Sequence, residues 1–218
     1  MDNIAIGTII GLIEAELEKK ELPIVTRLAE ENHDPFEILI STLLSLRTKD
    51  EVTAVATARL FALAKTPSAM VELTKEEIRK AIYPVGFYRN KAETIHSVCR
   101  TLIDRYDSRV PDSIDELLTM RGVGRKTANL VVALGFNGPG ICVDVHVHRI
   151  SNRLGYVHTK NPEETEFALR EKLPTQYWIK YNTLMVSFGR NICRPVSPHC
   201  SICPVFDYCP RVGIAKSR

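Results

Sequence analysis

The sequence lacks an apolar run long enough to cross a membrane, and it has no internal repeat and no low-complexity tract. It also lacks a strong excess of either charge, because 29 Lys and Arg against 26 Asp and Glu give a net charge of only +3. A polyanionic partner would therefore have to be recognised by a local patch. With 218 residues, 44% of them hydrophobic, the chain suits one large domain or two small ones and is too apolar to be disordered.

The charge is unevenly distributed along the chain. Residues 1–34 carry a net charge of −5 and residues 178–218 a net charge of +5. The apolar stretch 4–13 is not a typical signal sequence, since no basic segment precedes it and Glu14 and Glu16 follow it. We interpret it as an amphipathic helix of an intracellular protein, which would be cytoplasmic in a prokaryote and nuclear or mitochondrial in a eukaryote.

Helical signals dominate, and the fold class is predicted to be all-α. Ser/Thr-x-x-Glu capping boxes occur at 74–77 and 113–116, Asn161 precedes a first-turn proline, and a helix is expected from about Arg125. Residues 141–148 instead alternate apolar and polar side chains, as a strand does. A single strand would have nothing to pair with, so we expect extended chain or an irregular entry into a helix there.

Four of the six cysteines fall within seventeen residues, at Cys193, Cys200, Cys203 and Cys209. Two disulfides are disfavoured in a reducing compartment. A zinc site with four cysteines normally uses two Cys-x₂-Cys pairs, and only one such pair is present here. A [4Fe–4S] cluster accepts unequal spacings. The spacing alone leaves zinc and iron–sulfur open.

The segment 117–128, Leu-Leu-Thr-Met-Arg-Gly-Val-Gly-Arg-Lys-Thr-Ala, predicts two helices joined by a glycine turn. The backbone N–H groups around Gly122, Val123 and Gly124, together with the start of the next helix at Arg125, can bind a phosphate without sequence preference. This is a helix-hairpin-helix pattern. The alternative is an ordinary turn between two helices.

Two further residues are candidates for chemistry. Lys126 lies in the first turn of the second helix, where the helix dipole and neighbouring arginines favour a neutral, nucleophilic amine. A solvated lysine or a phosphate contact is the simpler interpretation. Asp144 follows eighteen residues later and is either a helix cap or an acid that works with Lys126.

Taken together, these motifs resemble the endonuclease III family of DNA glycosylases, in the helix-hairpin-helix–Gly/Pro–Asp superfamily. The resemblance covers roughly residues 25–210. It depends on Leu-Leu-Ser-x-x-Thr-Lys-Asp at 43–50, Gly-Phe-Tyr-x-x-Lys-Ala at 86–92, the glycine hairpin, Val-Asp-x-His at 143–146 and the cysteine spacing. It favours the [4Fe–4S] cluster over zinc.

The resemblance implies a particular domain organisation. Residues 28–138 would form a six-helix barrel that contains the hairpin, and residues 1–27 with 139–218 would form the cluster lobe. Double-stranded DNA that contains a damaged base would bind in a cleft between the lobes, and the protein would act as a monomer. Binding would be salt-sensitive, because the hairpin and the basic tail would contact phosphates.

The resemblance also implies an activity, the excision of oxidised pyrimidines such as thymine glycol and dihydrouracil. The damaged base would be flipped out of the duplex and Phe87 would fill the gap. Lys126 would attack the sugar C1′ and form a Schiff base, and β-elimination would then cut the strand. Asp144 would activate Lys126, and His146 would support Asp144 or a phosphate. Relatives that only remove the base lack a lysine at position 126.

Three positions depart from the family pattern. Arg47 stands where the family usually has Gln and could contact a guanine edge. Arg121 replaces the usual Pro before the hairpin, and Arg194 is one of only two basic residues in the Cys193–Cys200 loop. Arg47 keeps open a thymine or uracil mismatch glycosylase of the same superfamily.

Two alternatives come from other functional classes. One is a non-catalytic DNA-binding or redox module that uses the hairpin and the cluster. The other is a metal hydrolase built on Asp144, His146 and His148, which would need a sheet strand in this segment.

Overall fold

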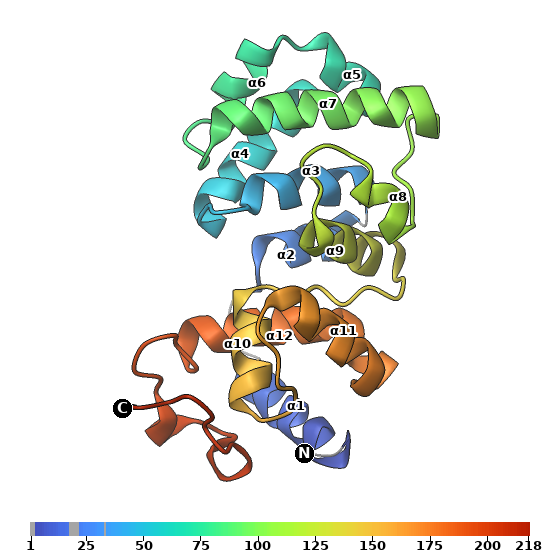
Figure 1. Cartoon of the computed structure of the whole chain (residues 1–218). Helices are drawn as coiled ribbons and strands as arrows, with labels where there is room; N and C mark the ends of the chain where they lie inside the picture. Colours follow the sequence, from blue (N-terminus) through green and yellow to red (C-terminus); the bar gives the residue numbers. More distant parts are fainter. Residues whose placement is uncertain (1–2, 18–21, 33) are drawn as a thin grey trace. The chain divides into compact units, whose positions relative to one another are not determined.

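The computed structural model describes residues 3–17, 22–32 and 34–218, and every regular element in them is a helix (Figure 1). No strand occurs in these ranges, so the all-α prediction is confirmed. The chain divides into two compact units. One, here called the inserted unit, is Ile24–Gly140, and the other, the terminal unit, combines Met1–Pro23 with Ile141–Arg218.

The inserted unit is built around one buried helix. Its helices are α2 (Ile24–Asn32), α3 (Pro35–Ser45), α4 (Asp50–Leu63), α5 (Pro67–Glu72), α6 (Lys75–Ile82), α7 (Tyr88–Tyr106), α8 (Ile114–Leu118) and α9 (Arg125–Phe136). Helix α3 is apolar on nearly all sides, and α2, α4, α7 and α9 pack around it. Asp34 caps its start by accepting a hydrogen bond of 2.9 Å from the Phe36 N–H.

The capping signals in the sequence act as expected. The hydroxyl of Thr74 accepts from the Glu77 N–H, and the Glu77 carboxylate accepts from the Thr74 N–H, which is a complete capping box. Asn161 accepts from the Glu164 N–H at the start of α11 (Pro162–Lys172). Ser113 makes a weaker contact of 3.5 Å with the Glu116 N–H at the start of α8.

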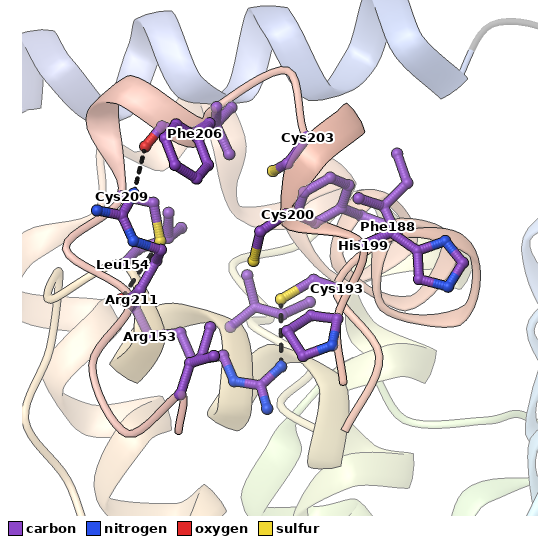
Figure 2. A pocket seen from close by; sticks show the side chains of 15 residues that line it. Arg153, Leu154, Phe188, Cys193, His199, Cys200, Cys203, Phe206, Cys209 and Arg211 are labelled. Carbon is purple, nitrogen blue, oxygen red and sulfur yellow. Dashed lines mark hydrogen bonds between the residues drawn. The ribbon is translucent and has the colours of Figure 1, made fainter. Parts of the chain in front are cut away.

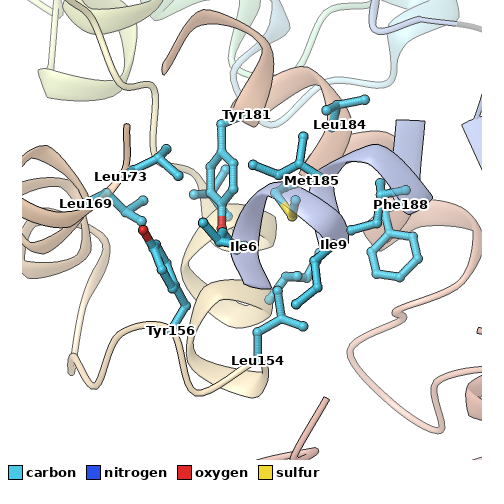
Figure 3. Close-up of a cluster of buried hydrophobic side chains, with 14 of the residues drawn as sticks. Ile6, Ile9, Leu154, Tyr156, Leu169, Leu173, Tyr181, Leu184, Met185 and Phe188 are labelled. Atoms are coloured by element: carbon cyan, nitrogen blue, oxygen red, sulfur yellow. The ribbon is translucent and has the colours of Figure 1, made fainter. Parts of the chain in front are cut away.

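The core of the terminal unit lies between α1 (Asn3–Leu17), α10 (Val145–Arg153), α11 and α12 (Trp178–Asn191) (Figure 3). Helix α1 contributes Ile6, Ile9, Ile10 and Ile13, all fully buried and spaced to form one helical stripe. Burial of each such side chain contributes about 1.5–3 kcal/mol to the free energy of unfolding. The predicted amphipathic N-terminal helix is therefore confirmed.

The segment 141–148 is not a strand. Residues 141–144 form no regular element and lead into α10, which begins at Val145. This agrees with the expected entry into a helix. No described helix is both long and apolar enough to span a membrane.

Candidate functional site

The turn between α8 and α9 has the geometry of a hairpin that requires glycine at one position. Gly122 has a φ of +81°, and a Cβ atom there would lie 2.6 Å from the Thr94 Cγ2 atom of α7. Val123 is buried and fixes the turn through a 3.1 Å hydrogen bond from its N–H to the Met120 carbonyl. Gly124 precedes α9 with open space around its Cα, so another backbone can approach there. The phosphate-binding role of this turn stays a prediction, and the Val123 N–H is already bonded within the turn.

The basic residues of the hairpin lie beside this turn. Arg125 and Lys126 are the first two residues of α9, both partly exposed, and Arg121 is exposed in the turn itself. The N-cap residue of α9 is Gly124, which has no side chain to cap the helix. The positive end of the helix dipole and three cationic side chains are thus concentrated around one turn, which is an arrangement that attracts a phosphate.

Asp144 is the N-cap of α10 in the terminal unit. Its Oδ1 atom accepts hydrogen bonds from the His146 N–H at 2.8 Å and the Val147 N–H at 3.0 Å. The helix-cap interpretation of Asp144 is therefore confirmed. The carboxylate is partly exposed and held in one orientation, so the cap also fixes an anionic group at a defined place.

The metal-hydrolase alternative is not supported. The His146 ring lies 3.1 Å from the Arg149 guanidinium, and the His148 ring lies 2.7 Å from the Thr165 hydroxyl. Among the described residues, no three His, Cys, Asp or Glu side chains are grouped closely enough to hold a single metal ion.

Arg47 and Phe87 lie together on the inserted unit. Arg47 follows α3, Phe87 precedes α7, and both are exposed. The guanidinium carbon of Arg47 is 5.5 Å from the centre of the Phe87 ring, within the range of a cation–π contact. The structure thus brings together two residues that the sequence marked for DNA contact on separate grounds.

The four clustered cysteines line one pocket in the terminal unit (Figure 2). The walls of the pocket include Ile150, Leu154, Phe188 and Val205. All four cysteines are free thiols, so the disulfide alternative is not realised. Tetrahedral zinc would hold its sulfur ligands about 2.3 Å from a single metal. A [4Fe–4S] cluster also takes four cysteine thiolates, and the four thiols around this pocket are a donor set that suits it.

Burial affects the pKa of two of these thiols. It raises the pKa of the Cys203 thiol to about 11 and also raises the pKa of the Cys209 thiol, with smaller contributions from the neighbouring sulfurs. Iron binding therefore has to displace protons from thiols that would otherwise stay neutral at pH 7. The buried Nε2 atom of His199, beside the pocket, has no hydrogen-bond partner among the described residues.

Two arginines of α10 contact the loop that begins at Cys193, and sequence reasoning missed them both. The Arg153 guanidinium donates to the Cys193 sulfur at 3.4 Å and to the carbonyls of Arg194 and Pro195 at 2.6 and 2.7 Å. Arg149 donates to the Cys193 carbonyl at 2.9 Å, and burial lowers its pKa. The side chain of Arg194 itself is exposed, and its carbonyl has the observed role.

Two regions of the chain match known family models. The family model described as "HhH-GPD superfamily base excision DNA repair protein" matches residues 40–175, and the model for the iron–sulfur binding domain of endonuclease III matches residues 193–209. The chain is 50% identical to endonuclease III of Thermotoga maritima, over 81% of this chain and 83% of that protein. This chain belongs to the endonuclease III family. It is a base excision repair DNA glycosylase with a [4Fe–4S] cluster, as the sequence predicted.

A further relative and two solved structures agree with this assignment. Endonuclease III of Escherichia coli K12 is 37% identical over 87% of this chain and 94% of its own length. A solved structure of a trapped endonuclease III–DNA covalent intermediate has a TM-score of 0.85 and 34% identity, and the match covers 97% of both chains. A thermostable thymine-DNA glycosylase matches with a TM-score of 0.81 and 25% identity over 96% of this chain and 97% of that one. The enzyme class predicted from the sequence, glycosylase with abasic-site lyase activity, is that of the endonuclease III family.

Proposed function

We propose that this enzyme removes oxidised pyrimidines, of the thymine glycol and dihydrouracil type, from duplex DNA. We further propose that it cuts the resulting abasic site through a Schiff base on Lys126. The observation that carries this proposal is the place of Lys126, in the first turn of α9 directly after the glycine hairpin. A phosphate held at that turn would bring a sugar of the same strand near the lysine amine.

The proposed reaction begins at the Lys126 amine. The neutral Lys126 amine attacks C1′, the bond from C1′ to the base breaks, and the base leaves with the bonding electrons and takes up a proton. Opening of the sugar ring gives an iminium on Lys126, and loss of a proton from C2′ expels the 3′ phosphate. Water then hydrolyses the imine and frees the lysine. The covalent endonuclease III–DNA intermediate in the similar structure supports a covalent route.

Asp144 has a proposed role in the same reaction. Its carboxylate would take a proton from the Lys126 ammonium and stabilise positive charge on the sugar. The α10 N–H groups that donate to its Oδ1 atom fix its orientation. When bound, the cluster would hold the Cys193–Cys209 loop in shape.

A duplex panel tests the substrate and the lysine together. The wild type and Lys126→Gln are incubated with duplexes that carry thymine glycol, dihydrouracil, an abasic site or a T·G mismatch, and borohydride is added to reduce any imine. We expect covalent adducts with the first three substrates, all absent in Lys126→Gln. Lys80→Gln, an exposed lysine on α6, is the matched control and should resemble the wild type. The absence of adducts in the wild type would contradict the proposal.

A mismatch glycosylase is the second candidate. It is supported by the likeness to the thymine-DNA glycosylase and by Arg47, which is exposed and long enough to reach a guanine edge. The T·G duplex separates the two candidates. Excision of thymine there, with the oxidised pyrimidines left intact, would select the second one.

A further inference from the structure

The loops that carry Arg47 and Phe87 both hold an exposed residue in left-handed backbone conformation. The φ angles are 55° at Arg47 and 58° at Phe87. This conformation costs a residue with a side chain free energy, so the surrounding contacts must enforce it at both positions. The cation–π contact between the two side chains is too exposed to do so alone.

Lys91 is the group that contacts both loops. Its side chain is buried, at 8% exposure, and its ammonium donates three hydrogen bonds. These go to the carbonyls of Leu44 and Leu46 at 2.7 and 2.6 Å and to the Thr48 hydroxyl at 3.1 Å. Because Leu46 and Thr48 flank Arg47, the ammonium holds the backbone before that residue and the Thr48 side chain after it.

Thr48 connects the Arg47 loop to the loop that carries Phe87. Its hydroxyl oxygen also accepts from the Gly86 N–H at 3.1 Å, and Gly86 directly precedes Phe87. A Cβ atom on Gly86 would lie 2.6 Å from the Arg47 carbonyl oxygen, so the two backbones touch. The Lys91 N–H in turn donates to the Phe87 carbonyl at 3.0 Å. Lys91, Thr48 and Gly86 therefore join the loops into one piece.

We propose that Lys91 is a positioning residue, which locks Arg47 and Phe87 into one rigid cationic–aromatic tip that enters the DNA base stack beside an extruded nucleotide. The exposed ring, 60% accessible, offers a flat apolar surface for stacking, and the guanidinium adds charge attraction to DNA. A rigid tip loses little conformational freedom on insertion, whereas two independent loops would have to be ordered at that moment.

The buried ammonium suits this role better than a role in stability. Its three acceptors are two carbonyls and a hydroxyl, all neutral, and burial lowers the pKa of Lys91 to about 8. A buried charge among neutral partners is costly to keep. An apolar side chain of similar length would fill the same space but could not hold the three oxygen atoms.

This inference depends on the proposed function only in taking duplex DNA as the substrate, so its test avoids the reaction itself. The probe is a duplex with a tetrahydrofuran abasic-site analogue opposite 2-aminopurine, whose fluorescence rises when a side chain unstacks it. Affinity and fluorescence are measured for the wild type, Lys91→Met, Phe87→Ala and the double variant. Lys80→Met is the matched control because Lys80 is exposed on α6.

We expect Lys91→Met and Phe87→Ala each to weaken binding about tenfold, the scale of one lost aromatic–base contact, and to abolish the fluorescence rise. The double variant should also be about tenfold weaker, because both changes remove the same insertion. Thr48→Val, which keeps the side-chain shape, should lower the fluorescence rise in the same direction and covers the case that Lys91→Met does not fold.

Two results would overturn the proposal. One is a Lys91→Met protein that behaves like Lys80→Met. The other is a double variant about a hundredfold weaker than the wild type, which would show independent effects. Neither depends on borohydride trapping, so failure of the proposed chemistry and failure of this inference remain distinguishable.

Discussion

Asp144 has two assignments, helix cap and catalytic carboxylate, and two substitutions separate them. Asp144→Ala removes the oxygen that accepts from the His146 and Val147 N–H groups at 2.8 and 3.0 Å. Loss of such a cap costs about 0.5–2 kcal/mol of the free energy of unfolding. Because the chain has 218 residues, each 1 kcal/mol lowers the melting temperature by about 2–4 °C. We therefore expect a decrease of about 1–8 °C, measured by circular dichroism.

Asp144→Asn keeps an oxygen in the same place but carries no charge. The cap is retained, and only the charge interaction with the α10 dipole is lost, about 0.3–1 kcal/mol. The melting temperature should therefore fall less than in Asp144→Ala. Excision should behave differently, because an amide can neither accept the proton nor stabilise a cationic sugar. Both variants should be slowed about 10²–10⁴-fold in single-turnover excision.

The test compares the melting temperatures and the excision rates of the two Asp144 variants. If Asp144→Asn were as unstable as Asp144→Ala, the capping argument would be wrong. If Asp144→Asn excised bases at the wild-type rate while Asp144→Ala did not, Asp144 would act only as a cap and the proposed catalytic role would be refuted.

The remaining predictions concern the hairpin and the cluster. Gly122→Ala should lower the free energy of unfolding by about 1–3 kcal/mol and weaken DNA binding, because its φ is +81° and the new Cβ atom would meet Thr94 at 2.6 Å. Gly124→Ala, with open space around it, is the control and should leave stability nearly unchanged in the same melts; equal losses in both would refute the geometric argument. Arg153→Met removes three donor contacts to the Cys193 loop and should speed loss of the visible cluster absorbance about tenfold, as expected for about 1–2 kcal/mol of lost hydrogen bonding. An unchanged rate would show that this loop is held elsewhere.

Local features of the sequence predicted local structure well. The capping box at Thr74, the cap at Asn161 and the glycine hairpin depend on residues within a few positions of each other, so their patterns are readable from the chain. The isoleucine stripe of α1 was visible for the same reason. The cysteine spacing predicted one shared centre, and the four cysteines line one pocket in Figure 2.

Features that depend on tertiary packing could not be predicted. Lys91 contacts Leu44, 47 residues earlier in the chain, and Arg153 contacts Cys193, 40 residues later. Nothing near Lys91 in the sequence marks it as buried, and a lysine in an amphipathic helix is usually solvated. The alternation at 141–148 favoured a strand, but the cap at Asp144 and the burial of Val147 made its second half helical.

The most direct test of the account is to identify the residue that becomes bonded to DNA. The wild-type protein is trapped with borohydride on a thymine glycol duplex and digested with protease and nuclease, and the adduct is located by mass spectrometry. The account predicts that the added mass lies on Lys126. An adduct on another lysine or on the terminal amine, or no adduct while the base is still released, would contradict it.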